Sequence, residues 1–124
     1  MDWKFNNSSP VYQQIMEKIL SAVLAGEFSP GEKIPSVRDL AVEARVNPNT
    51  VQHALQELEQ TGLLVTRSTN GRHVTDDETI LESMRNKRLR ELTEEFMGKF
   101  ATLGVPPSQV MQLLSDYEKE RNEK

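Results

Sequence analysis

Polar and basic side chains that could pair with nucleic acid gather between residues 38 and 53. Amide, hydroxyl and imidazole groups can pair with base edges, and guanidinium groups bind phosphates. The start of a helix adds free N–H groups and a partial positive charge, which suit a phosphate. This pattern predicts a DNA-contacting surface, against the alternative of an ordinary capped helix in water. The candidates are Arg38, Arg45, Asn47, Asn49, Thr50, Gln52 and His53.

Arg38 has an unexpected position within this set. It falls in the predicted first turn of a helix, where a positive charge opposes the helix dipole and stabilises nothing locally. A contact with a phosphate or a base would account for it. A surface ion pair with Glu32 or Asp39 is the alternative.

A second polar cluster surrounds the pair Asn70-Gly71. Residues 63–67 and 72–75 are short β-capable runs on either side, and Asn-Gly between such runs is a strong hairpin signal. A glycine at the tip lets the backbone approach a groove closely, and a neighbouring Arg suits phosphates or the minor groove. Asn70, Gly71 and Arg72 are therefore further candidates for DNA contact. A type I′ turn with polar flanks is the alternative.

Other kinds of chemistry are poorly represented in the sequence. The chain has no cysteine, which excludes disulfides, thiolate zinc sites and cysteine nucleophiles. Its two histidines, His53 and His73, are 20 residues apart and lack carboxylate partners at metal-ligand spacing. No nucleophile–base pair or pair of carboxylates is evident. We therefore expect neither an enzyme nor a metal or cofactor site.

Length and composition limit the class of protein further. A chain of 124 residues forms one domain, or one small domain with an appendage. Its net charge of −4 has the wrong sign for a protein that coats nucleic acid indiscriminately, so a nucleic-acid surface must be a local patch. No apolar run is long enough to cross a membrane, and the first residues lack the apolar stretch of a signal peptide. We expect a cytoplasmic protein without membrane contact.

Hydrophobic periodicity predicts three helices before the hairpin. A first helix covers residues 11–25, with Ser9 as its N-cap and Pro10 at its first position. A short second helix begins after the capping residue Ser36, and a third runs from Asn47-Pro48 to a stop at Gly62. About three residues join the second helix to the third. Helix, helix, tight turn, helix and hairpin is the order of a winged helix-turn-helix, which we expect over residues 1–75.

Residues 76–124 form a separate tail in this prediction. Apolar residues at spacings of three and four predict a long helix up to Gly104. A second helix begins near Ser108 and dissolves into a charged end from Glu118. Two helices cannot close a core of their own, so their apolar face is expected to pair with a second copy of the chain. The predicted dimer interface comprises Leu81, Leu92, Phe96, Phe100, Val110, Met111 and Leu114.

Several segments of residues 9–75 combine in a highly specific spacing. They are Pro10 to Ile15, Gly26 to Ala41, Val46 to Val51, Leu55 to Gly62-Leu63, and Gly71 to Val74. Together they strongly resemble the opening of GntR-family transcription regulators. The short tail and Asn47-Pro48-Asn49-Thr50 are similar to the YtrA subfamily within that family.

The resemblance implies a mostly α fold with a small β-hairpin wing and a two-helix dimerisation tail. It also implies a homodimeric bacterial repressor that binds a pseudo-palindromic double-stranded DNA operator. Contacts would come from the positions of Arg38, Asn49, Thr50 and Gln52 and from the wing around Gly71. A tail of 49 residues is too short for the large ligand-binding domains of other branches, although a crevice beside it could hold a small-molecule effector.

Two departures from the family pattern concern the DNA-contacting elements. The wing usually carries Gly-x-Gly followed by Thr-Phe-Val, whereas Thr69 replaces the first glycine here and Arg72-His73-Val74 follow the second. The third helix has Ala54-Leu55 where the family often has an aromatic residue. The operator sequences of other family members are therefore not expected to apply to this chain. A winged helix that binds another protein instead of an operator is the alternative function.

Overall fold

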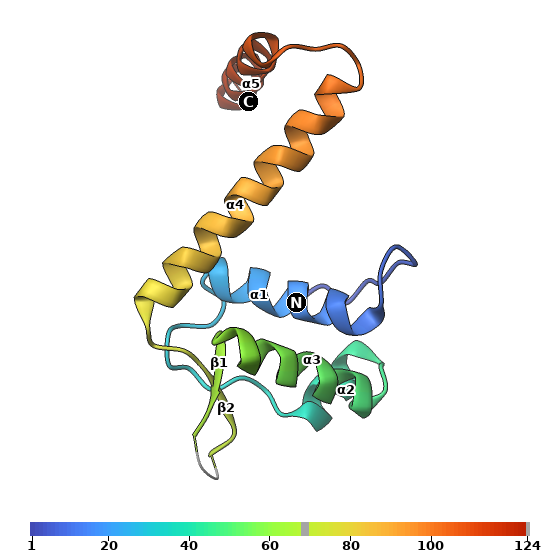
Figure 1. Ribbon diagram of the computed structural model, residues 1–124, viewed down its shortest axis with the longest axis vertical. Helices are drawn as coiled ribbons and strands as arrows, with labels where there is room; N and C mark the ends of the chain where they lie inside the picture. Colours follow the sequence, from blue (N-terminus) through green and yellow to red (C-terminus); the bar gives the residue numbers. More distant parts are fainter. Residues whose placement is uncertain (68–69, 124) are drawn as a thin grey trace. The chain divides into compact units, whose positions relative to one another are not determined.

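Helices α1 (Val11–Leu24), α2 (Val37–Ala44) and α3 (Pro48–Thr61) precede an antiparallel hairpin in the computed structural model (Figure 1). The structure describes residues 1–67 and 70–123. The strands of the hairpin are β1 (Leu64–Thr66) and β2 (Arg72–Val74), and helices α4 (Glu78–Ala101) and α5 (Pro107–Asn122) follow. The chain divides into two compact units, residues 1–83 and 84–124. The predicted mostly helical fold with a small hairpin is confirmed.

The core of the first unit lies between α1 and α3, with α2 packed against α3. Ile15 and Ile19 are buried on α1, and Val51 and Leu55 are buried on α3. Both pairs are four residues apart, which places each pair on one face of its helix. Leu40 of α2 and Leu63 and Leu64 after α3 are also buried. The opposite face of α3 is left for polar side chains.

Local capping signals set both ends of α3 and the start of α2. The Ser36 hydroxyl accepts a hydrogen bond from the Asp39 backbone N–H at 3.1 Å, and the Asn47 side chain accepts one from the Asn49 N–H at 2.8 Å. Gly62 ends α3 with a φ of +90°, a left-handed conformation that favours glycine. The predicted cap by Ser9 is wrong. Pro10 occupies the N-cap position, and the Ser9 carbonyl instead accepts from the Gln14 side chain.

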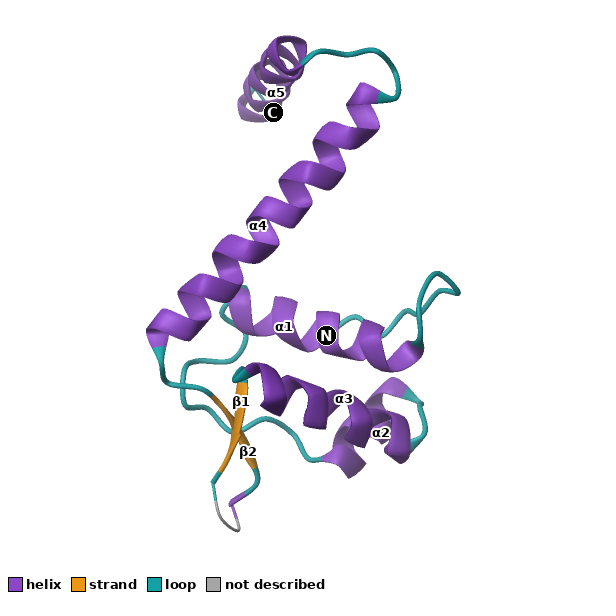
Figure 2. Cartoon of the chain, in the orientation of Figure 1, coloured by secondary structure: helices purple, strands orange, loops and turns teal. Residues whose placement is uncertain are grey.

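The hairpin is extended on one side by the segment before α2. Within the hairpin, Leu64 pairs with Val74 and Thr66 with Arg72. The Ile34 N–H donates to the Arg72 carbonyl, and the Val74 N–H donates to the Glu32 carbonyl. Residues 32–34 thus line β2 in the manner of a third strand. This pairing ties the wing to the chain that leads into α2 (Figure 2).

The tail is helical over more of its length than predicted. Helix α5 continues through the charged residues to Asn122 instead of dissolving from Glu118. Glu, Lys and Arg are good helix formers, so a charged sequence without Gly or Pro extends the helix. Helix α4 ends three residues before Gly104, which has a φ of +72°. Within the described part of the chain, no helix has the length and apolar character needed to cross a membrane.

Candidate nucleic-acid interface

The N-terminal half of α3 presents the predicted DNA-contacting side chains. Three residues, 45–47, separate α2 from α3, and Arg45 adopts a left-handed conformation with a φ of +58°. Val51 and Leu55 are buried, whereas Asn49 is exposed and Gln52 is half-buried. The burial of one face therefore leaves Asn49, Thr50 and Gln52 on the accessible side of this helix.

Arg38, in the first turn of α2, and Arg45, in the turn between α2 and α3, are both exposed. Within residues 1–67 and 70–123, neither guanidinium group takes part in an ion pair. The predicted alternative for Arg38, a pair with Glu32 or Asp39, is not formed. These two exposed cations of the helix-turn-helix leave their charge available for phosphate groups.

Asn47 and His53, two of the candidates on α3 and at its start, have structural partners within the chain. Asn47 uses its side-chain oxygen to cap α3. The ring of His53 is stacked on that of Tyr12, with ring centroids 3.9 Å apart and an interplanar angle of 22°. The Nε2 atom of His53 also lies 3.6 Å from a carboxylate oxygen of Glu57. The His53 side chain remains 48% exposed, so these contacts orient the ring without removing it from the surface.

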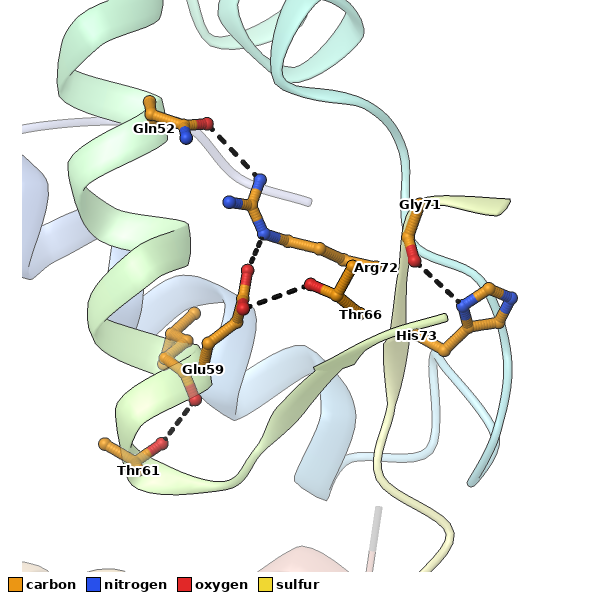
Figure 3. A network of polar contacts seen from close by, with 8 residues as sticks. Gln52, Glu59, Thr61, Thr66, Gly71, Arg72 and His73 are labelled. Atoms are coloured by element: carbon orange, nitrogen blue, oxygen red, sulfur yellow. Dashed lines mark hydrogen bonds and ion pairs between the residues drawn. The ribbon is translucent and has the colours of Figure 1, made fainter. Parts of the chain in front are cut away.

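Arg72 links the wing to the side of α3 through a polar network (Figure 3). Its Nε atom forms a close ion pair with the Oε1 atom of Glu59, and an Nη1 N–H donates to the Gln52 side-chain oxygen at 3.3 Å. The Thr66 hydroxyl donates to the other carboxylate oxygen of Glu59 at 3.1 Å. These bonds connect β1 and β2 with α3.

The same network perturbs the Glu59 carboxyl group. The hydrogen bond from the Arg72 guanidinium lowers the pKa of this carboxyl below its ordinary value, and the bond from Thr66 acts in the same direction. Partial burial opposes this shift, because it disfavours the charged carboxylate. The hydrogen-bonded cation prevails, so Glu59 is ionised at neutral pH.

The position of Arg72 differs from a simple phosphate contact at the wing. Its side chain is only 18% exposed, and two of its donors point to Glu59 and Gln52. Sequence reasoning missed Glu59 and Thr66 as members of the site. One signal was present: Gln52 and Glu59 are seven residues apart, which is two helical turns and therefore one face of α3.

The tip of the wing carries the remaining candidates. Asn70 is exposed, and Gly71 has a φ of +81°. A Cβ atom at Gly71 would lie 3.3 Å from the Cε atom of Lys33, so Lys33 joins the wing surface. Thr69, singled out in the sequence, lies outside the described residues. A pocket of about 320 Å³ separates the start of α2 from the wing, with Lys33, Ser36 and Arg72 among its lining residues.

The predicted apolar face of the tail is mostly accessible. The side chains of Leu92, Phe96, Met111 and Leu114 are exposed, and those of Leu81 and Phe100 are half-buried. Phe96 and Phe100 pack edge to face, with ring centroids 4.9 Å apart.

Val110 requires a correction. It is 0% exposed in the single chain, so it has no surface to offer a partner. Val110 is buried by other residues of the same chain.

Comparisons with known proteins assign the chain to a family. Residues 11–74 match the model described as bacterial regulatory proteins, gntR family. The chain is 34% identical to the uncharacterised HTH-type transcriptional regulator YhcF of Bacillus subtilis, over 90% of this chain and 93% of that protein. It is 36% identical to the HTH-type transcriptional repressor YtrA of the same organism, over 69% of this chain and 70% of that protein.

Solved structures show the same relationship. A GntR family transcriptional regulator from Listeria monocytogenes superposes with a TM-score of 0.84 at 33% identity, covering 90% of this chain and 98% of that one. The DNA-binding domain of AraR in complex with operator ORR3 matches 58% of this chain and 87% of its own length, with a TM-score of 0.53 and 29% identity. The chain belongs to the gntR family of bacterial regulatory proteins and is a DNA-binding regulator of transcription.

Proposed function

We propose that this regulator is a repressor that binds a pseudo-palindromic operator as a homodimer and blocks transcription by occupying it. The observation that carries the proposal is the exposed polar start of α3, preceded in the helix-turn-helix by two exposed arginines, Arg38 and Arg45, that form no ion pair in the described part of the chain. Asn49 and Gln52 would contact base edges in the major groove, while the arginines would contact phosphates. The wing around Asn70 and Gly71 would lie along the adjacent backbone or minor groove.

The names of related proteins support this proposal. YtrA is called a repressor, and the AraR domain was solved on an operator. We extend both properties to this chain, with residues 1–75 as the DNA-binding domain and residues 76–124 as the dimerisation tail. The protein would act in the cytoplasm, where operator DNA is found.

The dimer would follow from the apolar side chains of the tail. Leu92 and Phe96 are accessible on α4, and Met111 and Leu114 on α5. Pairing two tails would remove this surface from water. It would also hold two copies of α3 about one turn of DNA apart, roughly 34 Å, which suits successive major grooves. The second half-site would then bind at a high effective concentration.

Competition binding tests the proposal against the alternative of a protein-binding winged helix. Fragments of the protein's own genome are incubated with the purified chain in the presence of unrelated competitor DNA, and the retained fragments are sequenced. Retention of fragments that share a palindromic sequence is the expected result. Loss of all DNA to the competitor would instead favour the protein-binding function. Adding small metabolites to the same assay would reveal an effector.

A further inference from the structure

The Gln52 side chain is held in one orientation by its neighbour on the wing. Arginine has hydrogen-bond donors and no acceptor, so the atom of Gln52 that meets Arg72 must be the carbonyl oxygen. The distance between Oε1 and the Arg72 Nη1 atom is 3.3 Å. In the described part of the chain, the Gln52 amide nitrogen forms no hydrogen bond, and it is not the atom that faces Arg72 (Figure 3). Gln52 therefore retains two free donors.

This orientation matters for which base Gln52 can read. A free glutamine reads adenine with both ends of its amide, accepting from N6–H and donating to N7. The Gln52 oxygen has two lone pairs and one already accepts from Arg72, whereas both N–H donors are free in the described part of the chain, so the side chain offers a base more donor than acceptor capacity. Guanine presents two neighbouring acceptors in the major groove, N7 and O6, and thymine presents one at O4.

We infer that Glu59, acting through Arg72, sets the base preference of Gln52 toward a base with an acceptor oxygen, guanine foremost. The inference rests on the proposed function, because it requires α3 to enter the major groove. Glu59 is a positioning residue in this account and does not touch the DNA. Its carboxylate pairs with the Nε atom of Arg72 and leaves Nη1 directed at Gln52.

The supporting contacts make this arrangement specific. The Thr66 hydroxyl occupies the second oxygen of Glu59, so the carboxylate is fixed from both sides. Arg72 is anchored by its backbone as well, since its carbonyl accepts from the Ile34 N–H at 3.0 Å. Both ends of the Arg72 side chain are thereby positioned before any DNA is bound.

The test is selection of binding sites from a pool of random duplexes, carried out with the full-length chain. Comparison of the parent with Gln52→Ala identifies the base pair that Gln52 reads, as the position where preference disappears. The parent should prefer guanine or thymine there. Glu59→Gln should reduce that preference about tenfold while the other positions keep theirs. Glu17→Gln is the matched control, because Glu17 is exposed on α1 and its substitution removes the same charge.

A charge exchange sharpens the test. In Glu59→Arg combined with Arg72→Glu, the carboxylate introduced at position 72 would accept from the Gln52 amide nitrogen and turn its oxygen toward the DNA. Preference should then move to a base with a donor, adenine or cytosine. Circular dichroism and a thermal melt check that each variant is folded. If the exchange does not fold, Arg72→Met replaces it and should relax the preference as Glu59→Gln does.

The outcomes separate this inference from the function on which it rests. A parent that selects no sequence contradicts the proposed function itself. A parent that selects a clear site but prefers adenine at the Gln52 position overturns the inference, because the amide oxygen is then used on the base. Unchanged preference in a folded Glu59→Gln and a folded Arg72→Met overturns it as well, as does a Gln52→Ala variant that selects the parental site.

Discussion

Arg72, on the second strand of the wing, forms an ion pair with Glu59, on the last turns of the helix that precedes the hairpin. The pair joins the two elements that are proposed to contact DNA, α3 in the major groove and the wing at the adjacent backbone or minor groove. Because Arg72 also bonds Gln52, the wing and the side chains of α3 are positioned together. Arg72 therefore positions side chains within the site, in addition to contributing positive charge to the wing.

This ion pair should make part of the stability depend on pH. The pKa of Glu59 is lowered in the folded chain, mainly by Arg72. The corresponding stability is therefore present above the unfolded pKa and is lost as pH falls through the lowered value. Glu59→Gln should cost about 1 kcal/mol at pH 7, and the difference from the parent should vanish at acidic pH. Thermal melts of both chains between pH 7 and pH 3 measure it. A difference that stays constant to pH 3 would contradict the assignment.

Arg38 should contribute affinity without sequence preference. Its exposed guanidinium has no ion-pair partner in the described part of the chain. Arg38→Ala should weaken binding to all duplexes and reduce the slope of log K against log salt by about one. Lys4→Ala, which removes an exposed charge outside the interface, is the control. Titrations at several salt concentrations measure the slope, and equal slopes for the two variants would exclude a phosphate contact by Arg38.

Truncation of Leu55 to alanine should lower the stability of the first unit more than truncation of Val42. It is 1% exposed in the core between α1 and α3, whereas Val42 on α2 is 74% exposed. Leu55→Ala should lower the free energy of unfolding by about 2–5 kcal/mol, through lost burial and a cavity. Val42→Ala should change it by less than about 0.5 kcal/mol. Urea unfolding followed by circular dichroism compares them, and similar midpoints would contradict the described core.

Phe96 should be required for the proposed dimer. Its side chain is 41% exposed on α4 and packs edge to face on Phe100. Phe96→Asp places a charge in the apolar face and should yield a monomer of 14.1 kDa by light scattering, where the parent has about twice that mass. Asn86→Asp adds the same charge at an exposed polar position of α4 and should leave the dimer intact. A dimeric Phe96→Asp variant would assign the apolar face another role.

Features set by neighbouring residues could be predicted from the sequence. Ser36 and Asn47 cap helices through bonds to residues three and two positions ahead. Gly62 ends α3 because the left-handed conformation there favours glycine. The buried face of α3 follows from the spacing of Val51 and Leu55. Each of these features depends on residues that are only a few positions apart in the sequence.

Features that depend on distant residues could not be predicted in the same way. Arg72 meets Gln52 from 20 positions away, and this contact requires the twist and placement of the hairpin relative to α3. The stacking of Tyr12 on His53 likewise requires the packing of α1 on α3. Val110 has the same apolar character as its accessible neighbours, and its complete burial depends on packing that periodicity does not specify.

Binding of a palindromic operator by a homodimer is tested most directly by the stoichiometry of the complex and the symmetry of the bound DNA. A duplex recovered by selection is titrated with the purified chain, and the mass of the complex is measured by light scattering. Two chains should bind one duplex, whose sequence contains two inverted half-sites with centres about one helical turn apart. Halving the site should abolish tight binding. A single chain that binds one half-site as tightly as the full duplex would contradict operator binding by a homodimer.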